Sequence, residues 1–139
     1  MAAQRATTLA YYALFHTLAQ AIAVLLIGPA TDAQMDWLKD PKAADEQWWI
    51  KAYRILDHRK AKDVCRNYRG SSGMERFTGA FVHLQELRHI ADYHPFGGPR
   101  LEEAQELVDD AAIAIQSFHE ASESERRAFL AAILITQRR

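Results

Sequence analysis

Residues 9–27 read LAYYALFHTLAQAIAVLLI, a stretch without a single Lys, Arg, Asp or Glu. The stretch shows no strand-like alternation of polar and apolar residues, and we expect it to form a helix. The hydroxyl group of Thr7 or Thr8 can cap the start of this helix, and Gly28 with Pro29 ends it.

The same stretch has nearly the length that crosses a bilayer, which is about 20 residues. Arg5 ahead of it loosely resembles the start of a secretory signal, although no convincing cleavage region follows. His16, Thr17 and Gln20 lie in its middle, where polar groups are costly in lipid. We therefore expect a buried first helix in a cytoplasmic protein without membrane contact. A membrane span or a signal peptide is the alternative.

The composition bounds the class of protein. The chain has 139 residues, 49% of them hydrophobic and 25% charged, which is typical of one globular domain covering residues 1–139. Seventeen Lys and Arg stand against eighteen Asp and Glu, so the bulk charge does not indicate a nucleic-acid binder. The single cysteine, Cys65, excludes an intrachain disulfide and a cysteine-based zinc cluster, and we expect it in the core.

Helical periodicity continues along the chain, without repeats or low-complexity segments. We expect further helices over about 44–56, from a cap at Asp57 to about 66, over about 75–92, over about 101–119, and from Ser122 or Ser124 onward. The helix over 101–119 should bury one continuous apolar face, made of Ala104, Leu107, Val108, Ala111, Ala112, Ile115 and Phe118. These elements predict an all-α fold, an up-and-down bundle of about five to six helices.

Charge is unevenly distributed along the chain. Residues 51–69 carry seven basic side chains against two Asp, whereas residues 101–125 carry eight acidic side chains and no Lys or Arg. One interpretation is a solvated face on each of two exposed helices. The other is a basic surface that binds a phosphate backbone, with the acidic helix on the opposite side. Four candidate phosphate contacts lie in the basic segment: Arg54, His58, Arg59 and Lys62.

Arg88 is an unusual residue for its position. The helix over 75–92 places it in one row with Phe77, Phe81 and Leu84. A guanidinium does not lose its proton in proteins, so at the edge of a core it needs a partner or a cleft. Asp92 follows one turn later, and a structural ion pair between the two side chains is the first interpretation.

The second interpretation is catalytic and adds His94. Pro95 ends the helix, so the imidazole of His94 can turn back toward Arg88. A guanidinium binds a phosphodiester through two parallel hydrogen bonds and neutralises the charge of the transition state. An imidazole can take a proton from a ribose 2′-hydroxyl or give one to the leaving oxygen. Such a pair would cleave RNA without a metal or a cofactor, and it would spare DNA.

The remaining histidines receive structural interpretations. We expect His16 to be a hydrogen-bonded core residue. His58 forms an i, i+4 couple with Arg54, which is a second possible phosphate contact, and a surface or capping role is the other interpretation. No group of His and carboxylate residues has the spacing of a helical zinc site, so no metal site is predicted.

Three segments resemble the HEPN superfamily, small helical bundles found in prokaryotic toxins and RNA-processing factors. The family's nuclease motif is an Arg followed by Asn, Asp or His, with about four to six residues between the Arg and a final His. Arg88, His89 and His94 fit it, with five residues between Arg88 and His94. The segment YYALFH at residues 11–16 is similar to a stretch in one HEPN branch, and Ala91-Asp92-Tyr93 recurs there.

The resemblance implies a metal-independent endoribonuclease that cleaves single-stranded RNA, as in the toxic half of a toxin–antitoxin pair. Arg88 would bind the scissile phosphate, and His94 would serve as general base or acid. His89, Asp92 and Tyr93 would orient them. A homodimer and a cognate antitoxin protein are the implied partners. The alternative is a non-catalytic dimeric HEPN module that binds a partner protein or a nucleotide.

Overall fold

The computed structural model describes residues 2–29, 44–93 and 99–135, with the side chains of residues 44–47 and 91–93 left out. These residues form six helices: α1 (Ala2–Leu26), α3 (Ala44–Tyr53), α4 (His58–Asn67), α5 (Ser72–Tyr93), α6 (Leu101–Glu120) and α7 (Glu123–Ile135). The described part of the chain holds no strand, which confirms the predicted all-α bundle of five to six helices.

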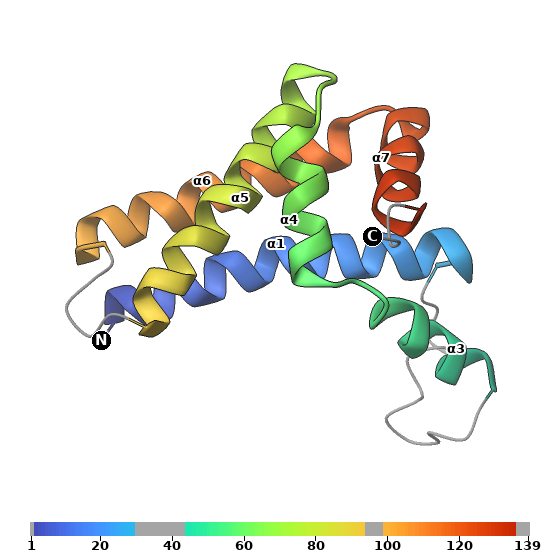
Figure 1. Cartoon of the computed structure of the whole chain (residues 1–139), viewed down its shortest axis with the longest axis horizontal. Coiled ribbons are helices and arrows are strands. Elements are labelled where there is room, and N and C mark those ends of the chain that lie inside the picture. Colours follow the sequence, from blue (N-terminus) through green and yellow to red (C-terminus); the bar gives the residue numbers. More distant parts are fainter. Residues whose placement is uncertain (1, 30–43, 94–98, 136–139) are drawn as a thin grey trace.

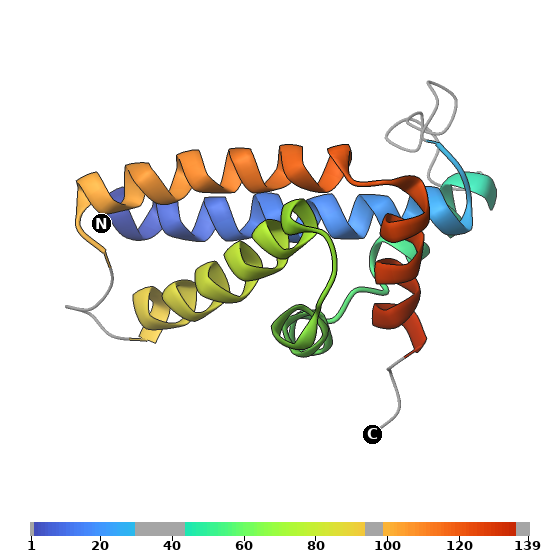
Figure 2. The ribbon, with the colours of Figure 1, turned by 90° about the horizontal axis from the view of Figure 1, so that it is seen from above.

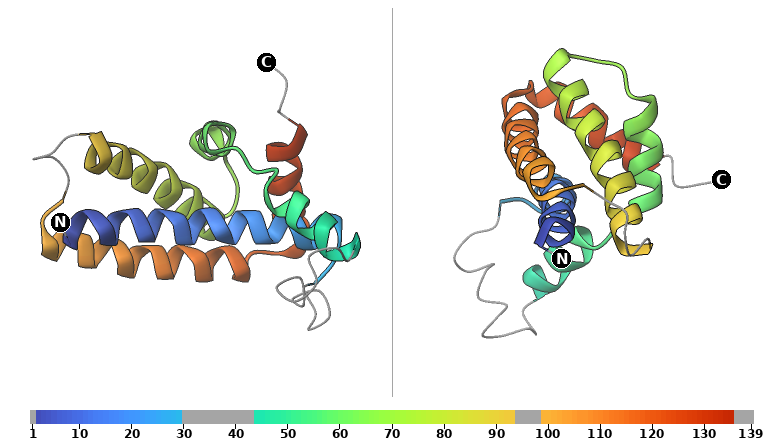
Figure 3. Two further views of the ribbon diagram at one scale, coloured as in Figure 1. Left: turned by 90° about the horizontal axis from the view of Figure 1, so that it is seen from below. Right: turned by 90° about the vertical axis from the view of Figure 1, so that its left-hand side faces the viewer.

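The two long helices α1 and α6 lie side by side and run in the same direction, with α5 packed against both (Figures 1 and 2). The short helix α4 packs on α5, and α7 contacts α1 and α4 near the carboxyl end of α1. The basic helix α4 and the acidic helix α6 lie on opposite sides of α5 (Figure 3), an arrangement that fits both interpretations of the charge pattern.

The core forms where α1, α5, α6 and α7 meet. Leu14 and Leu18 of α1 are fully buried, as are Phe77 and Phe81 of α5. The ring of Phe77 lies 4.9 Å from that of Phe118 on α6 (centroid to centroid). The expected row of Phe77, Phe81 and Leu84 is therefore confirmed, and Cys65 is buried as predicted.

The expected apolar face of α6 is only partly correct. Ala104, Ala111 and Phe118 are buried, but Val108 is 37% exposed and Ala112 is also exposed. Val108 and Ala112 instead line a shallow apolar groove between α6 and the first half of α1. The prediction failed because α1 covers only part of the apolar face of α6 that the sequence pattern forms.

Several helix ends differ from expectation. Helix α1 begins at Ala2, well before Thr7, whose hydroxyl donates to the carbonyl oxygen of Ala3 instead of capping. Helix α5 begins at Ser72 rather than near residue 75, because the hydroxyl of Ser71 accepts from the backbone N–H of Met74. Helix α3 ends at Tyr53, two to three residues early.

Two predicted caps are confirmed. The carboxylate of Asp57 accepts from the backbone N–H groups of Arg59 and Lys60 at the start of α4. The hydroxyl of Ser122 accepts from the N–H of Glu125 at the start of α7. The Glu125 carboxylate does not return to Ser122 as in a capping box.

The carboxylate of Glu125 instead holds the loop between α4 and α5. It accepts from the backbone N–H of Ser71 at 2.9 Å and from the hydroxyl of Tyr68. These hydrogen bonds lower the pKa of Glu125 below its ordinary value of 4.5. One carboxylate thus fastens α7 to the segment that leads into α5.

Replacing Glu125 with Gln is expected to lower stability by about 1 kcal/mol at pH 7, because a charged acceptor is lost at a half-buried site. The melting temperature should fall by about 3 °C. Because the pKa of Glu125 is lower in the folded state, its ionised carboxylate stabilises the fold above pH 4.5. This contribution is lost as the pH falls below that value. Thermal melts of the variant and the wild type should therefore converge near pH 3.

Glu123→Gln, which breaks an exposed ion pair with Arg127, is the matched control. An equal loss of stability in this control, or a constant difference between Glu125→Gln and the wild type at all pH values, would contradict the prediction.

Helix α1 is also long and apolar enough to cross a membrane by length and composition, with 39% of its most apolar window buried. Core helices of soluble proteins and signal sequences share these properties. The absence of membrane contact and the cytoplasmic location stay predictions.

Candidate functional site

The side chain of Arg88 points from α5 to α1. One terminal nitrogen (Nη1) donates to the hydroxyl of Tyr12 at 2.9 Å. The guanidinium carbon lies 5.0 Å from the ring centre of Tyr11 and 5.5 Å from that of Tyr12, within the range of cation–π attraction. Arg88 is half-buried and continues the row of Phe77, Phe81 and Leu84, in which the ring of Phe81 contacts that of Tyr11 on the same helix, α1.

His58 lies in the same cluster, although it comes from a different helix. It is the first residue of α4, and its ring stacks on that of Phe15 with the centroids 3.9 Å apart. Its Nδ1 atom is hydrogen-bonded to the hydroxyl of Tyr11 at 2.5 Å. The side-chain amide of Gln85, one turn before Arg88, donates to the His58 carbonyl oxygen at 3.3 Å. We call Tyr11, Tyr12, Phe15, His58 and Arg88 the Arg88–His58 cluster.

The electrostatics of the cluster keep His58 neutral at physiological pH. Burial lowers the pKa of His58 below 6.5, and the positive charge of Arg88 lowers it further, while Asp57 opposes both effects. Burial also raises the pKa of Tyr11 far above its ordinary value, so its phenol stays protonated. A neutral imidazole beside a guanidinium is an arrangement that can accept a proton.

A basic surface continues from the cluster along α4. His58, Lys62 and Arg66 follow one another at intervals of four residues, so they lie on one side of the helix. Arg59 and Arg66 are exposed and Lys62 is half-exposed. The candidate phosphate contacts Arg59 and Lys62 therefore lie on a surface that leads to His58.

The predicted pairing of Arg54 with His58 is wrong. Arg54 lies in the turn after α3, whereas His58 begins α4, so the two residues do not share a helix. His16 is also not a core residue. It is exposed, and its Nδ1 atom is hydrogen-bonded to the hydroxyl of Tyr53 on α3.

The other residues of the predicted nuclease motif are only partly described. His94 lies outside the described residues, as does Pro95. Asp92 and Tyr93 belong to the last turn of α5, and their side chains are among those left out. His89 is exposed on α5. The structure thus brings Arg88 together with His58, a partner the sequence did not assign to it.

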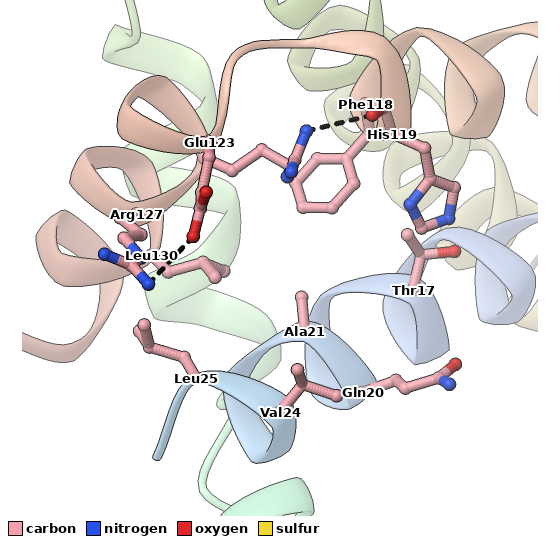
Figure 4. A pocket seen from close by; sticks show the side chains of 11 residues that line it. Thr17, Gln20, Ala21, Val24, Leu25, Phe118, His119, Glu123, Arg127 and Leu130 are labelled. Carbon is pink, nitrogen blue, oxygen red and sulfur yellow. Dashed lines mark hydrogen bonds and ion pairs between the residues drawn. The ribbon is translucent and has the colours of Figure 1, made fainter. Parts of the chain in front are cut away.

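A second candidate lies at the other end of α1. A cavity of about 420 Å³ opens between the second half of α1 and the junction of α6 with α7 (Figure 4). The arginine side chains that line the cavity already have partners within the protein. Arg127 is paired with Glu123 at 2.8 Å, and Arg126 donates to the carbonyl oxygens of His119 and Ala121. These contacts close the end of α6, so we assign this region a structural role.

Comparison with family models, with curated proteins and with solved structures finds no match for the chain. The described residues also contain no group of three or more His, Cys, Asp or Glu that could hold a metal ion. Membership of the HEPN superfamily therefore rests on the motifs quoted from the sequence and stays a prediction.

Proposed function

We propose that the protein is a metal-independent endoribonuclease of the HEPN type, which cleaves single-stranded RNA at the Arg88–His58 cluster. The observation that carries the proposal is that the Arg88 guanidinium and the imidazole of His58 both lie against the rings of Tyr11 and Tyr12. The resemblance of Arg88, His89 and His94 to the HEPN nuclease motif supports the same reaction class. A role as a toxin, countered by a cognate antitoxin protein, is part of this proposal.

In this mechanism Arg88 binds the scissile phosphate and stabilises the charge that develops on it. An imidazole takes the proton of the ribose 2′-hydroxyl, whose oxygen then attacks the phosphorus. The bond to the 5′-oxygen breaks, leaving a cyclic phosphate and a 5′-hydroxyl group. The basic side of α4 holds the strand on either side of the reacting link by its phosphates. The family motif assigns His94 as general base or acid, and it implies a homodimer.

The test is cleavage of a fluorescently labelled single-stranded RNA by the purified full chain in the presence of EDTA. We expect cleavage with 2′,3′-cyclic phosphate ends, and no cleavage of DNA of the same sequence or of RNA with 2′-O-methyl groups. Absence of cleavage across a pool of random RNA sequences, or cleavage that EDTA abolishes, would overturn the proposal.

The second candidate function is a non-catalytic dimeric module that binds a partner protein or a nucleotide. The hydrogen bond from Arg88 to Tyr12, with the stacking on Tyr11, favours it, because these contacts tie α5 to α1. This function predicts a wild type without RNA cleavage and a large loss of melting temperature in Arg88→Ala.

A further inference from the structure

We infer that His58 is a catalytic residue, the base that takes the proton of the attacking 2′-hydroxyl group while Arg88 binds the phosphate. This inference rests on the ribonuclease function proposed above, and it assigns a role that lies outside the Arg88–His94 motif. Its basis is geometric. His58 is held in place by Phe15 and Tyr11. It begins the basic side of α4 and lies against the two tyrosine rings that Arg88 also faces.

The hydrogen bond to Tyr11 controls which nitrogen of His58 reacts. When Nδ1 carries the hydrogen and donates to the phenol oxygen of Tyr11, the lone pair of Nε2 is available to accept a proton. Tyr11 is fully buried, so its oxygen is a fixed partner. Phe15 fixes the plane of the ring from its face. Tyr11 is therefore a positioning residue for His58.

The charges around His58 suit a base rather than a permanent cation. Arg88 on α5 opposes a positive imidazole, and Asp57 at the start of α4 favours it. The groups of α1 in contact with the ring are the aromatic rings of Tyr11, Tyr12 and Phe15. The balance lowers the pKa of His58, so the imidazole is free to accept a proton at pH 7 and releases it readily afterwards.

The proposed step is balanced. Nε2 of His58 takes the 2′-hydroxyl proton as the 2′-oxygen bonds to phosphorus, and the bond from phosphorus to the 5′-oxygen breaks. The leaving 5′-oxygen takes a proton from a water molecule, and the proton on His58 neutralises the hydroxide that remains. No oxidant, metal or cofactor is needed.

The experiment compares wild type, His58→Asn and Tyr11→Phe by the rate of RNA cleavage between pH 5 and pH 8. Asn keeps a polar atom for Tyr11, so the fold should survive, which the melting temperature checks. We expect His58→Asn to lower kcat by about 100- to 10,000-fold with little change in KM, and to remove the rise of rate with pH. Tyr11→Phe should lower kcat less. His83→Asn, an exposed histidine on α5, is the matched control and should cleave like the wild type.

A chemical rescue separates catalysis from structure. Added imidazole should restore part of the activity of His58→Gly, and it should not restore Arg88→Ala. If His58→Asn cleaves at the wild-type rate while Arg88→Ala does not, the inference about His58 is wrong and the ribonuclease function stands. If the wild type cleaves no RNA, the proposed function and this inference both fail.

Discussion

Replacing Arg88 with Lys is expected to lower RNA cleavage by about 100- to 1,000-fold, the loss typical of removing one donor to a developing oxyanion. Lysine keeps the charge and the apolar stem but lacks the planar fork that grips two phosphate oxygens. The fall should appear in kcat, because the contact strengthens as negative charge develops. The measurement is steady-state cleavage of a single-stranded RNA, together with a thermal melt of each variant.

The matched control is Arg76→Lys. Arg76 lies on the same helix, is exposed and donates to the hydroxyl of Ser117, away from the Arg88–His58 cluster. It should cleave RNA at the wild-type rate. Equal activity of Arg88→Lys and the wild type would exclude a bidentate phosphate contact. A loss of activity that follows a loss of folded protein would favour the structural tie between α1 and α5 instead.

Arg88 was identifiable from the sequence because a charged side chain is unusual in an apolar row of a helix. A guanidinium in a row with Phe77, Phe81 and Leu84 must meet a polar group, and the row itself was readable from helical periodicity. The sequence did not show which polar group Arg88 would contact. Tyr12 lies 76 residues away in the chain, and the angle at which α5 crosses α1 decides which side chain of α1 it reaches.

For His58, the sequence predicted the wrong partner. Its spacing from Arg54 suggested a helical couple, but Asp57 caps α4 between them and α3 has already ended at Tyr53. The cap at Asp57 was itself predicted, and it should have separated the two residues. The sequence did contain a signal for the actual surroundings of His58. Three aromatic rings, those of Tyr11, Tyr12 and Phe15, lie at adjoining positions of one helix, and the two phenol hydroxyls need polar partners.

Some helix starts were predicted correctly from capping side chains, and others were missed. Asp57 and Ser122 cap their helices as expected. Thr7 was expected to cap α1, yet its hydroxyl bonds back within the helix, and the preceding Ala residues extend α1 to Ala2. Hydroxyl side chains serve both roles, and sequence alone does not separate them.

Replacing Phe77 with Ala is expected to destabilise the protein by about 4 kcal/mol, the largest stability loss we predict. The ring of Phe77 is fully buried and contacts the rings of Phe81, Phe118 and Phe129, which lie on α5, α6 and α7. Alanine would leave a cavity where these helices meet, because the long helices α1 and α6 hold the surrounding backbone in place. A domain stability of about 5–15 kcal/mol leaves little margin for such a loss.

Urea denaturation followed by circular dichroism measures the effect, with an expected midpoint shift of about 2 M for a slope of about 2 kcal/mol per M. Ile113→Ala on α6 is the matched control: its side chain is 49% exposed, so it should cost less than about 1 kcal/mol. Phe77→Leu should fall between the two, because leucine refills most of the volume. A loss below about 1 kcal/mol for Phe77→Ala would mean that the three helices do not meet on this ring. The position of Arg88, three turns further along the same row of α5, would then be in doubt as well.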